Sequence, residues 1–156
     1  MFYRNSLITV LAALLLATSC DKINLYEKLH AFDANQWASN DTATFRFHIR
    51  DSSRYKVFFV LRHTDAYHFN NIWVNIMVAD PDSSYSFKRE FILADDTRWL
   101  GTGMGDVFEH RLAFAPSAEK LRPGTYTFKL LPVMREDPLR NVVNAGIRVE
   151  RQDELE

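Results

Sequence analysis

Two groups of side chains have residue types that could bind a metal. His63, Asp65 and His68 offer two imidazoles and a carboxylate in one loop, but their spacing is not an established zinc pattern. Four acids flank a glycine-rich stretch and could supply oxygen ligands to calcium: Asp95, Asp96, Asp106 and Glu109. They lack the regular spacing of an EF-hand loop, so we expect them to cap turns and solvate the loop. We therefore predict no metal.

Nucleophilic catalysis and nucleotide binding find little support. No serine stands in a G-x-S-x-G turn. Gly101, Gly103 and Gly105 are not a nucleotide-binding fingerprint, because a strand pattern follows them and no helix is expected there to receive a phosphate. A β-bulge or an irregular crossing loop accounts for them better. We predict neither catalytic residues nor a cofactor.

Four aromatic residues could either stack on sugar rings or lie in the core: Tyr67, Phe69, Trp73 and Trp99. Large aromatic side chains are mostly buried for packing reasons, which favours the core.

The first twenty residues, MFYRNSLITVLAALLLATSC, have the features of a lipoprotein signal. Arg4 precedes an apolar run from Leu7 to Ala17, which is shorter than the roughly 20 residues of a permanent transmembrane helix. Small residues then lead to Cys20, the single cysteine of the chain. We predict cleavage before Cys20 and its acylation, which would anchor the protein in a membrane, inner or outer. The alternative is an ordinary cleaved signal with a chance cysteine.

The chain after this signal has the size and composition of one globular domain. The full sequence has 156 residues, is 47% hydrophobic and carries a formal charge of -1. A chain without a basic excess has no electrostatic reason to bind nucleic acid. We expect a signal peptide over 1–19, an acylated tether over 20–24, a single domain over 25–151 and a frayed tail over 152–156.

Alternating apolar and polar residues predict an all-β fold. Strands are expected over 42–49, 55–62, 72–78, 85–93, 107–114, 125–131 and 144–151, with a weaker one over 25–32, where a short helix is the alternative. Residues 80–84 have the composition of a hairpin turn, and 33–41, 94–106 and 115–124 that of turns or loops. About seven or eight strands of this kind predict an antiparallel β-sandwich of jelly-roll type, with a closed barrel as the alternative.

Three segments, together with the lipoprotein start, resemble the gliding motility lipoprotein family GldH of the Bacteroidota. They are LRHTDAYHFNNIWV (61–74), LADDTRWLGTGMGD (93–106) and PGTYTFKLLPVMREDPLRNVVNAGIRVE (123–150), in the order of the family. In the first segment the matching residues are Arg62, Tyr67, Phe69 and Asn71, while His68 replaces the usual proline. In the last, Leu131 and Pro132 stand where the family tends to carry a glutamine.

The resemblance implies a non-enzymatic lipoprotein needed for gliding motility, which in that phylum is coupled to type IX protein secretion. We therefore predict a protein of the cell envelope, anchored through Cys20, that acts by contact with envelope proteins. The alternatives are a surface or periplasmic glycan-binding lipoprotein and a hydrolase of unrecognised type. Exposed coplanar aromatics beside a groove would favour the glycan binder, and convergent acids or histidines the hydrolase. A flat or strand-edge patch would favour a protein partner.

Overall fold

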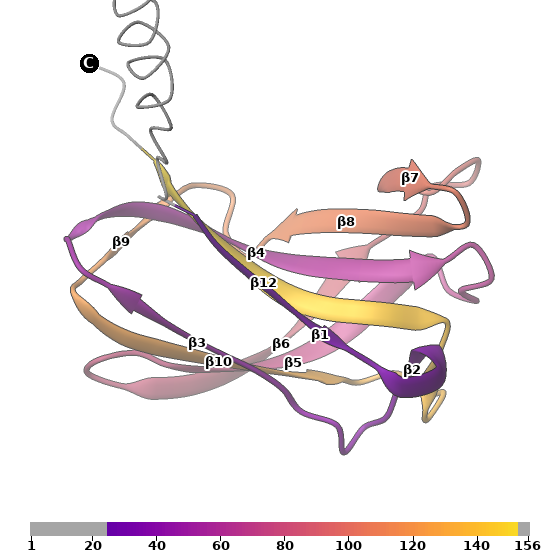
Figure 1. Cartoon of the computed structure of the whole chain (residues 1–156), viewed down its shortest axis with the longest axis horizontal. Helices are drawn as coiled ribbons and strands as arrows, with labels where there is room; N and C mark the ends of the chain where they lie inside the picture. The colour runs from indigo at the N-terminus through magenta and orange to yellow at the C-terminus, as the bar shows by residue number, and fades with distance from the viewer. Residues whose placement is uncertain (1–24, 153–156) are drawn as a thin grey trace, which may run out of the picture.

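Two antiparallel β-sheets packed face to face make up residues 25–152, the part of the chain that the computed structural model describes (Figure 1). The six-stranded sheet runs in the order β1 (Leu25–Ala31), β12 (Val142–Gln152), β4 (Ser53–Thr64), β8 (Val107–Ala113) and β7 (Thr102–Met104), with β9 (Glu119–Leu121) also paired to β4. The four-stranded sheet runs β3 (Ala43–Ile49), β10 (Gly124–Pro132), β5 (Asn71–Ala79) and β6 (Ser84–Ile92). The predicted sandwich is thus confirmed.

The core forms because each long strand presents an apolar side to the opposite sheet. Along β3, buried Phe45, Phe47 and Ile49 alternate with exposed polar residues. The Phe47 ring stacks on Tyr126 of β10 at 5.6 Å and lies 5.1 Å from Tyr26 of β1, which belongs to the other sheet. Aromatic rings therefore join the two sheets as well as neighbouring strands.

Eight strands have seven residues or more, and each matches a strand expected from the sequence, including the weaker one that became β1. The hairpin is also present. β5 and β6 pair in register, and the Asp80 carboxylate accepts hydrogen bonds from the backbone N–H groups of Asp82 and Ser83.

Four further strands were not expected from the sequence, and three of them lie in segments expected to be turns or loops. β7 lies in the glycine-rich stretch, β9 in residues 115–124, and β2 (Gln36–Trp37) follows a 3-10 turn, η1 (Asp33–Asn35), within 33–41. β2 pairs with β11 (Leu139–Arg140). Expecting only loops there was wrong, because strands of two or three residues are too short to show a period and depend on their pairing partners.

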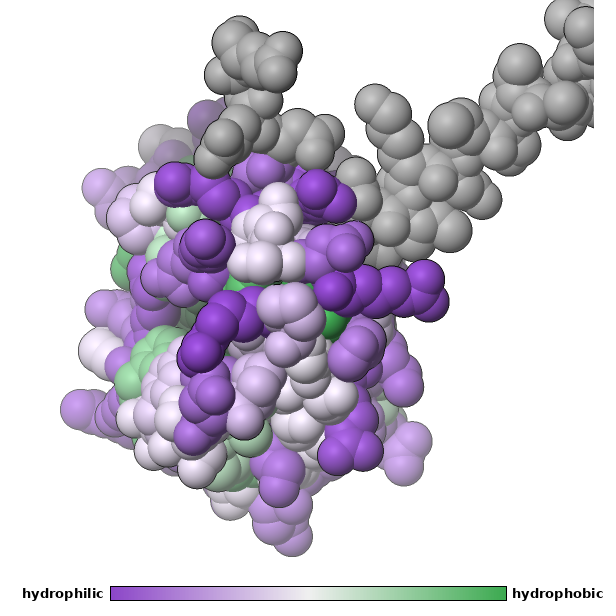
Figure 2. All heavy atoms as spheres, turned by 90° about the vertical axis from the view of Figure 1, so that its left-hand side faces the viewer, coloured by the Kyte–Doolittle hydropathy of each residue, from purple (hydrophilic) through white to green (hydrophobic). Residues whose placement is uncertain are grey.

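One end of the sandwich carries the start of β1. Leu25 pairs with Glu150, and Arg54 at the start of β4 pairs with Gln152, so Gln152 belongs to β12 and not to the tail expected over 152–156. The rest of that tail lies outside the described residues. Figure 2 shows this end, where the surface is mostly hydrophilic. Here Arg122 forms an ion pair with Asp82, and Arg54 donates a hydrogen bond to the Ala118 carbonyl. None of the helical segments in residues 25–152 has the length and apolar character needed to span a membrane.

Candidate functional site

Two histidines meet inside the sandwich where β4 and β8 run side by side. His63 lies opposite Phe108 and His110 opposite Leu61, so the two histidines are diagonal neighbours two positions out of direct register, and both are buried in the core. Their Nε2 atoms lie 2.9 Å apart, and His63 Nδ1 lies 2.7 Å from the Thr64 carbonyl oxygen. A carbonyl only accepts, so His63 Nδ1 carries the proton, and His63 Nε2 accepts from the Nε2–H of His110. These hydrogen bonds make His63 a neutral ring with a fixed tautomer and place a proton on His110 Nε2. The two rings are here called the histidine pair.

Burial keeps the histidine pair neutral. It lowers the pKa of His63, against a smaller opposing effect of the hydrogen bond to Thr64. For His110, burial and then the nearby His63 lower the pKa to about 4. A proton on either ring would have to be held where little water can solvate it. The pair therefore resists protonation at neutral pH.

Aromatic rings and a glycine enclose the histidine pair. The His63 ring lies 4.4 Å from Trp99, 5.0 Å from Tyr67 and 5.9 Å from Phe108. A Cβ atom on Gly101 would lie 2.5 Å from the Glu109 carbonyl oxygen and 2.8 Å from His110 Nε2. Glycine is thus required at position 101 because the loop passes directly over β8. This close passage agrees with the irregular crossing loop that was one of the two explanations expected for the glycine-rich stretch.

The three residues first considered for a metal do not converge. His63 faces His110, Asp65 is exposed and donates its backbone N–H to Asp106, and the exposed His68 lies 3.9 Å from Glu136. Among residues 25–152, no three His, Cys, Asp or Glu side chains gather as metal ligands.

The four acids first considered for calcium do not form one site either. The Asp95 carboxylate closes its own turn, accepting hydrogen bonds from Thr97 and from the Arg98 N–H, and these bonds lower its pKa. The Glu109 carboxylate lies 2.7 Å from Arg62 and 2.8 Å from Arg111. Asp96 and Asp106 are exposed. Glu109 therefore forms ion pairs with two arginines on the outer side of the six-stranded sheet.

Residues that carry the family resemblance hold the loop between β4 and β5 in place. The Tyr67 hydroxyl donates to the Asn71 carbonyl oxygen at 3.0 Å, and the Tyr67 ring meets Phe69 edge to face at 5.8 Å. Burial, with a further effect of the Glu136 charge, raises the pKa of Tyr67. This hydroxyl therefore remains a hydrogen-bond donor.

The four aromatics first considered for sugar stacking divide between core and surface. Tyr67 is buried, and Phe69 and Trp99 pack against the core, as expected. Trp73 differs, because β5 directs it outward, where Lys88 Nζ lies 5.0 Å from its ring centre. These four rings do not form one exposed platform.

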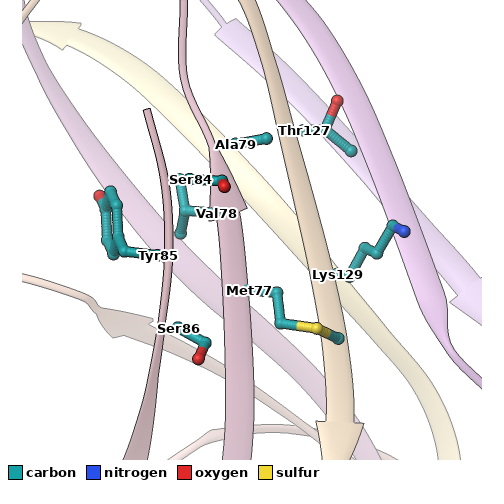
Figure 3. A pocket seen from close by; sticks show the side chains of 8 residues that line it. All are labelled: Met77, Val78, Ala79, Ser84, Tyr85, Ser86, Thr127 and Lys129. Carbon is teal, nitrogen blue, oxygen red and sulfur yellow. The ribbon is translucent and has the colours of Figure 1, made fainter. Parts of the chain in front are cut away.

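The outward side of β3, β10, β5 and β6, here called the four-stranded face, was not foreseen as a site. It contains a shallow hollow of about 350 Å³ at the end of β5, the start of β6 and the middle of β10. Met77, Ser86, Thr127 and Lys129 line the hollow, whereas the Tyr85 ring lies on the other side of β6 (Figure 3). The sequence signal was present, since the polar positions of these alternating strands define this side.

The histidine pair, Asp95, Glu109 and Tyr67 thus have partners within the domain, while the four-stranded face stays uncovered in the described residues. The fold is an all-β sandwich that follows a segment with the features of a lipoprotein signal. The chain belongs to the GldH lipoprotein family, whose sequence model matches residues 24–149. As a member of this family, it is a lipid-anchored protein of the cell envelope. The predicted acylation site, Cys20, lies outside the described residues.

Two curated relatives agree with this assignment. The chain is 27% identical to the gliding motility lipoprotein GldH of Flavobacterium johnsoniae, over 98% of this chain and 100% of the relative. It is 24% identical to a gliding motility lipoprotein GldH homolog of Christiangramia forsetii, over 90% of this chain and 91% of the relative.

Solved structures give weaker likenesses. Dimeric latent PorU from Porphyromonas gingivalis matches 84% of this chain at 12% identity and a TM-score of 0.37, and the chain spans 13% of that protein. The VP2 subviral particle of infectious bursal disease virus matches 82% of this chain at 14% identity and a TM-score of 0.36, and the chain spans 32% of it. Likenesses at this level carry no argument.

Proposed function

We propose that the chain is a non-enzymatic component or accessory of the gliding motility machinery and its associated type IX secretion, and that it acts by contact with envelope proteins. A signal peptide over 1–19 directs its export, and acylated Cys20 holds its domain beside the membrane. Membership of the GldH family supports a role in gliding motility. The internal pairing of the titratable side chains supports a role in protein contact rather than in catalysis.

The observation that carries the mode of action is the uncovered four-stranded face. Its strands are long and regularly paired, so it is a rigid surface. The chemically versatile groups, by contrast, have internal partners: the histidine pair holds β4 to β8, and Glu109 is bound by two arginines. A rigid sheet surface of this kind suits a protein partner.

The test is an affinity pull-down of the acylated protein from its native membranes, analysed by mass spectrometry. The control is the Cys20→Ala variant, which cannot be acylated at this position. We expect motility or type IX secretion components to be recovered only with the intact anchor. Retention of glycan on the domain without any protein partner would contradict the proposal and favour the glycan-binding alternative.

A further inference from the structure

Both outer faces of the sandwich carry cations, but the arginines at the centre of the six-stranded sheet have carboxylate partners. On the six-stranded sheet, Glu109 pairs with Arg62 and Arg111, and Arg148 pairs with Glu27 and Glu150. These three central arginines are matched by three carboxylates of the same chain. Arg54, Lys56 and Lys120 lie on the same side of the sheet without an ion pair in residues 25–152.

The four-stranded face has cations without such partners. Arg46 of β3, Lys129 of β10 and Lys88 of β6 are exposed, and none forms an ion pair within residues 25–152. Lys88 instead lies over the Trp73 ring. Of the outward positions of these four strands, all of which the structure describes, only Glu90 carries a carboxylate, and it accepts a hydrogen bond from Asn71. The face therefore has a net charge of about +2 on a chain whose formal charge is -1.

Apolar side chains lie between these cations. Trp73 and Met77 of β5 and Leu131 of β10 are half-buried on this side of the sheet. Met77 is opposite Lys129 on one side and Ser86 on the other, at the hollow shown in Figure 3. An aromatic residue and a methionine at the centre, with charged and hydroxyl groups around them, match the composition of protein interfaces.

The same features disfavour a glycan or a lipid surface as the binding partner of this face. A sugar ring would stack on an exposed aromatic face, but Lys88 lies over Trp73 and Tyr85 points to the other side of β6. Insertion into lipid would need protruding apolar side chains, whereas Met77 and Trp73 lie half-buried in the sheet surface.

We propose that the four-stranded face binds an acidic protein surface, with Arg46, Lys88 and Lys129 meeting its carboxylates around an apolar centre at Trp73 and Met77. This inference rests on the proposed function, in that it names the surface and the charge of the protein contact. Charge complementarity of this kind sets partner choice and association rate, and it weakens at high salt.

Position-resolved photo-crosslinking in cells tests the inference with the full-length, anchored chain. A photoreactive phenylalanine derivative is placed at Ser86 or Thr127 on the four-stranded face, or at Arg111, which is 49% exposed on the opposite face. We expect protein adducts from the first two positions, with crosslinked partner peptides rich in Asp and Glu.

Charge reversal supplies the matched comparison. In Arg46→Glu/Lys88→Glu/Lys129→Glu, adduct yield should fall about tenfold or more, because several rim charge pairs become repulsive together. Lys28→Glu/Lys120→Glu/Arg135→Glu changes the net charge equally at exposed positions elsewhere and should leave the yield unchanged. Unfolding midpoints of both variants show whether the fold is kept. The variant Arg46→Gln/Lys88→Gln/Lys129→Gln repeats the test by removing the three positive charges without adding negative ones.

The outcomes separate this inference from the proposed function. Protein adducts only from Arg111 would overturn the four-stranded face as the contact and leave the protein-contact function standing. Lipid or glycan adducts from Ser86 and Thr127, or protein adducts insensitive to the charge reversal, would overturn the acidic partner. Absence of adducts at all three positions would count against both.

Discussion

At the scale of single residues, the histidine pair shows how two polar rings can be buried without an unpaired polar contact between them. Each ring is neutral, and two hydrogen bonds run in one direction. His110 donates to His63, and His63 donates to the Thr64 carbonyl oxygen. Protonation is unfavourable at both rings for different reasons. His63 can gain a proton on Nε2 only by losing the hydrogen bond from His110, and a second proton on His110 would place a charge in the core.

Stability should therefore fall as the pH drops from about 6.5 to about 4. In this window the unfolded chain binds a proton at His110, whereas the folded chain does not until its lowered pKa of about 4 is reached. The shift corresponds to about 3 kcal/mol of unfolding free energy from His110 alone, fully lost below that window. Urea denaturation at several pH values measures the loss.

The His110→Gln variant should flatten this pH dependence, because its amide can still donate to His63 but does not titrate. His68→Asn removes an exposed histidine and should leave the wild-type dependence in place. An unchanged pH dependence in His110→Gln would contradict the assignment to the histidine pair.

Gly101 gives a second prediction at this scale. In Gly101→Ala the new methyl group would meet the Glu109 carbonyl and His110, so we expect a loss of about 1–3 kcal/mol in unfolding free energy. Gly103→Ala is the matched control, since its Cβ would lie 3.3 Å from the edge of the Phe108 ring, which can move. Equal effects of the two substitutions in urea denaturation would refute the close-packing explanation.

At the scale of elements, periodicity predicted the long strands and missed the short ones for a physical reason. A strand such as β3 buries alternate residues, so its own sequence alternates between apolar and polar residues and can be recognised without its partners. β2 and β11 have two residues each and exist because Trp37 and Leu139 pair across the domain. Such elements depend on partners that are distant in sequence, and no local pattern specifies them.

The candidate site was predictable to the same extent. Alternation over residues 107–114 places His110 on the inward side with Phe108 and Leu112, but nothing local shows that His63 faces it from 47 positions away. The outward position of Trp73 follows from the period of β5, and overriding that period with a general preference for burial was the mistake.

Trp37 anchors the short strand pair, and its loss gives a prediction at this scale. It is fully buried, stacks on Phe32 at 4.8 Å and donates its indole N–H to the Asp41 carbonyl. Trp37→Ala should cost about 3–5 kcal/mol of unfolding free energy. Trp37→Phe should cost less, because the ring contact is kept and mainly the hydrogen bond is lost. Thermal or urea unfolding distinguishes the two, and Leu100→Ala, at a position 51% exposed, should have little effect. A small effect of Trp37→Ala would show that the pair contributes little.

At the scale of the whole molecule, the anchor and the domain have separate tasks. We expect Cys20→Ala to abolish fatty-acid incorporation and to move the protein from the membrane fraction to the soluble fraction, since several acyl chains are needed for stable anchoring. Metabolic labelling with a clickable fatty acid and membrane fractionation measure both effects. Labelling that persists in Cys20→Ala would place the acylation elsewhere.

The position of β1 has a mechanical consequence for an anchored protein. β1 is the first strand after the tether, and it pairs with β12 through seven residue pairs, from Leu25 opposite Glu150 to Ala31 opposite Asn144. When a partner on the four-stranded face is pulled along the strand direction away from the membrane, the force reaches these seven pairs together, in shear. The sheet then has to yield over its whole first strand at once, whereas a perpendicular pull would open the pairs one at a time. If the proposed anchor and partner are both in place, this pairing would resist a force that acts between them along the strand.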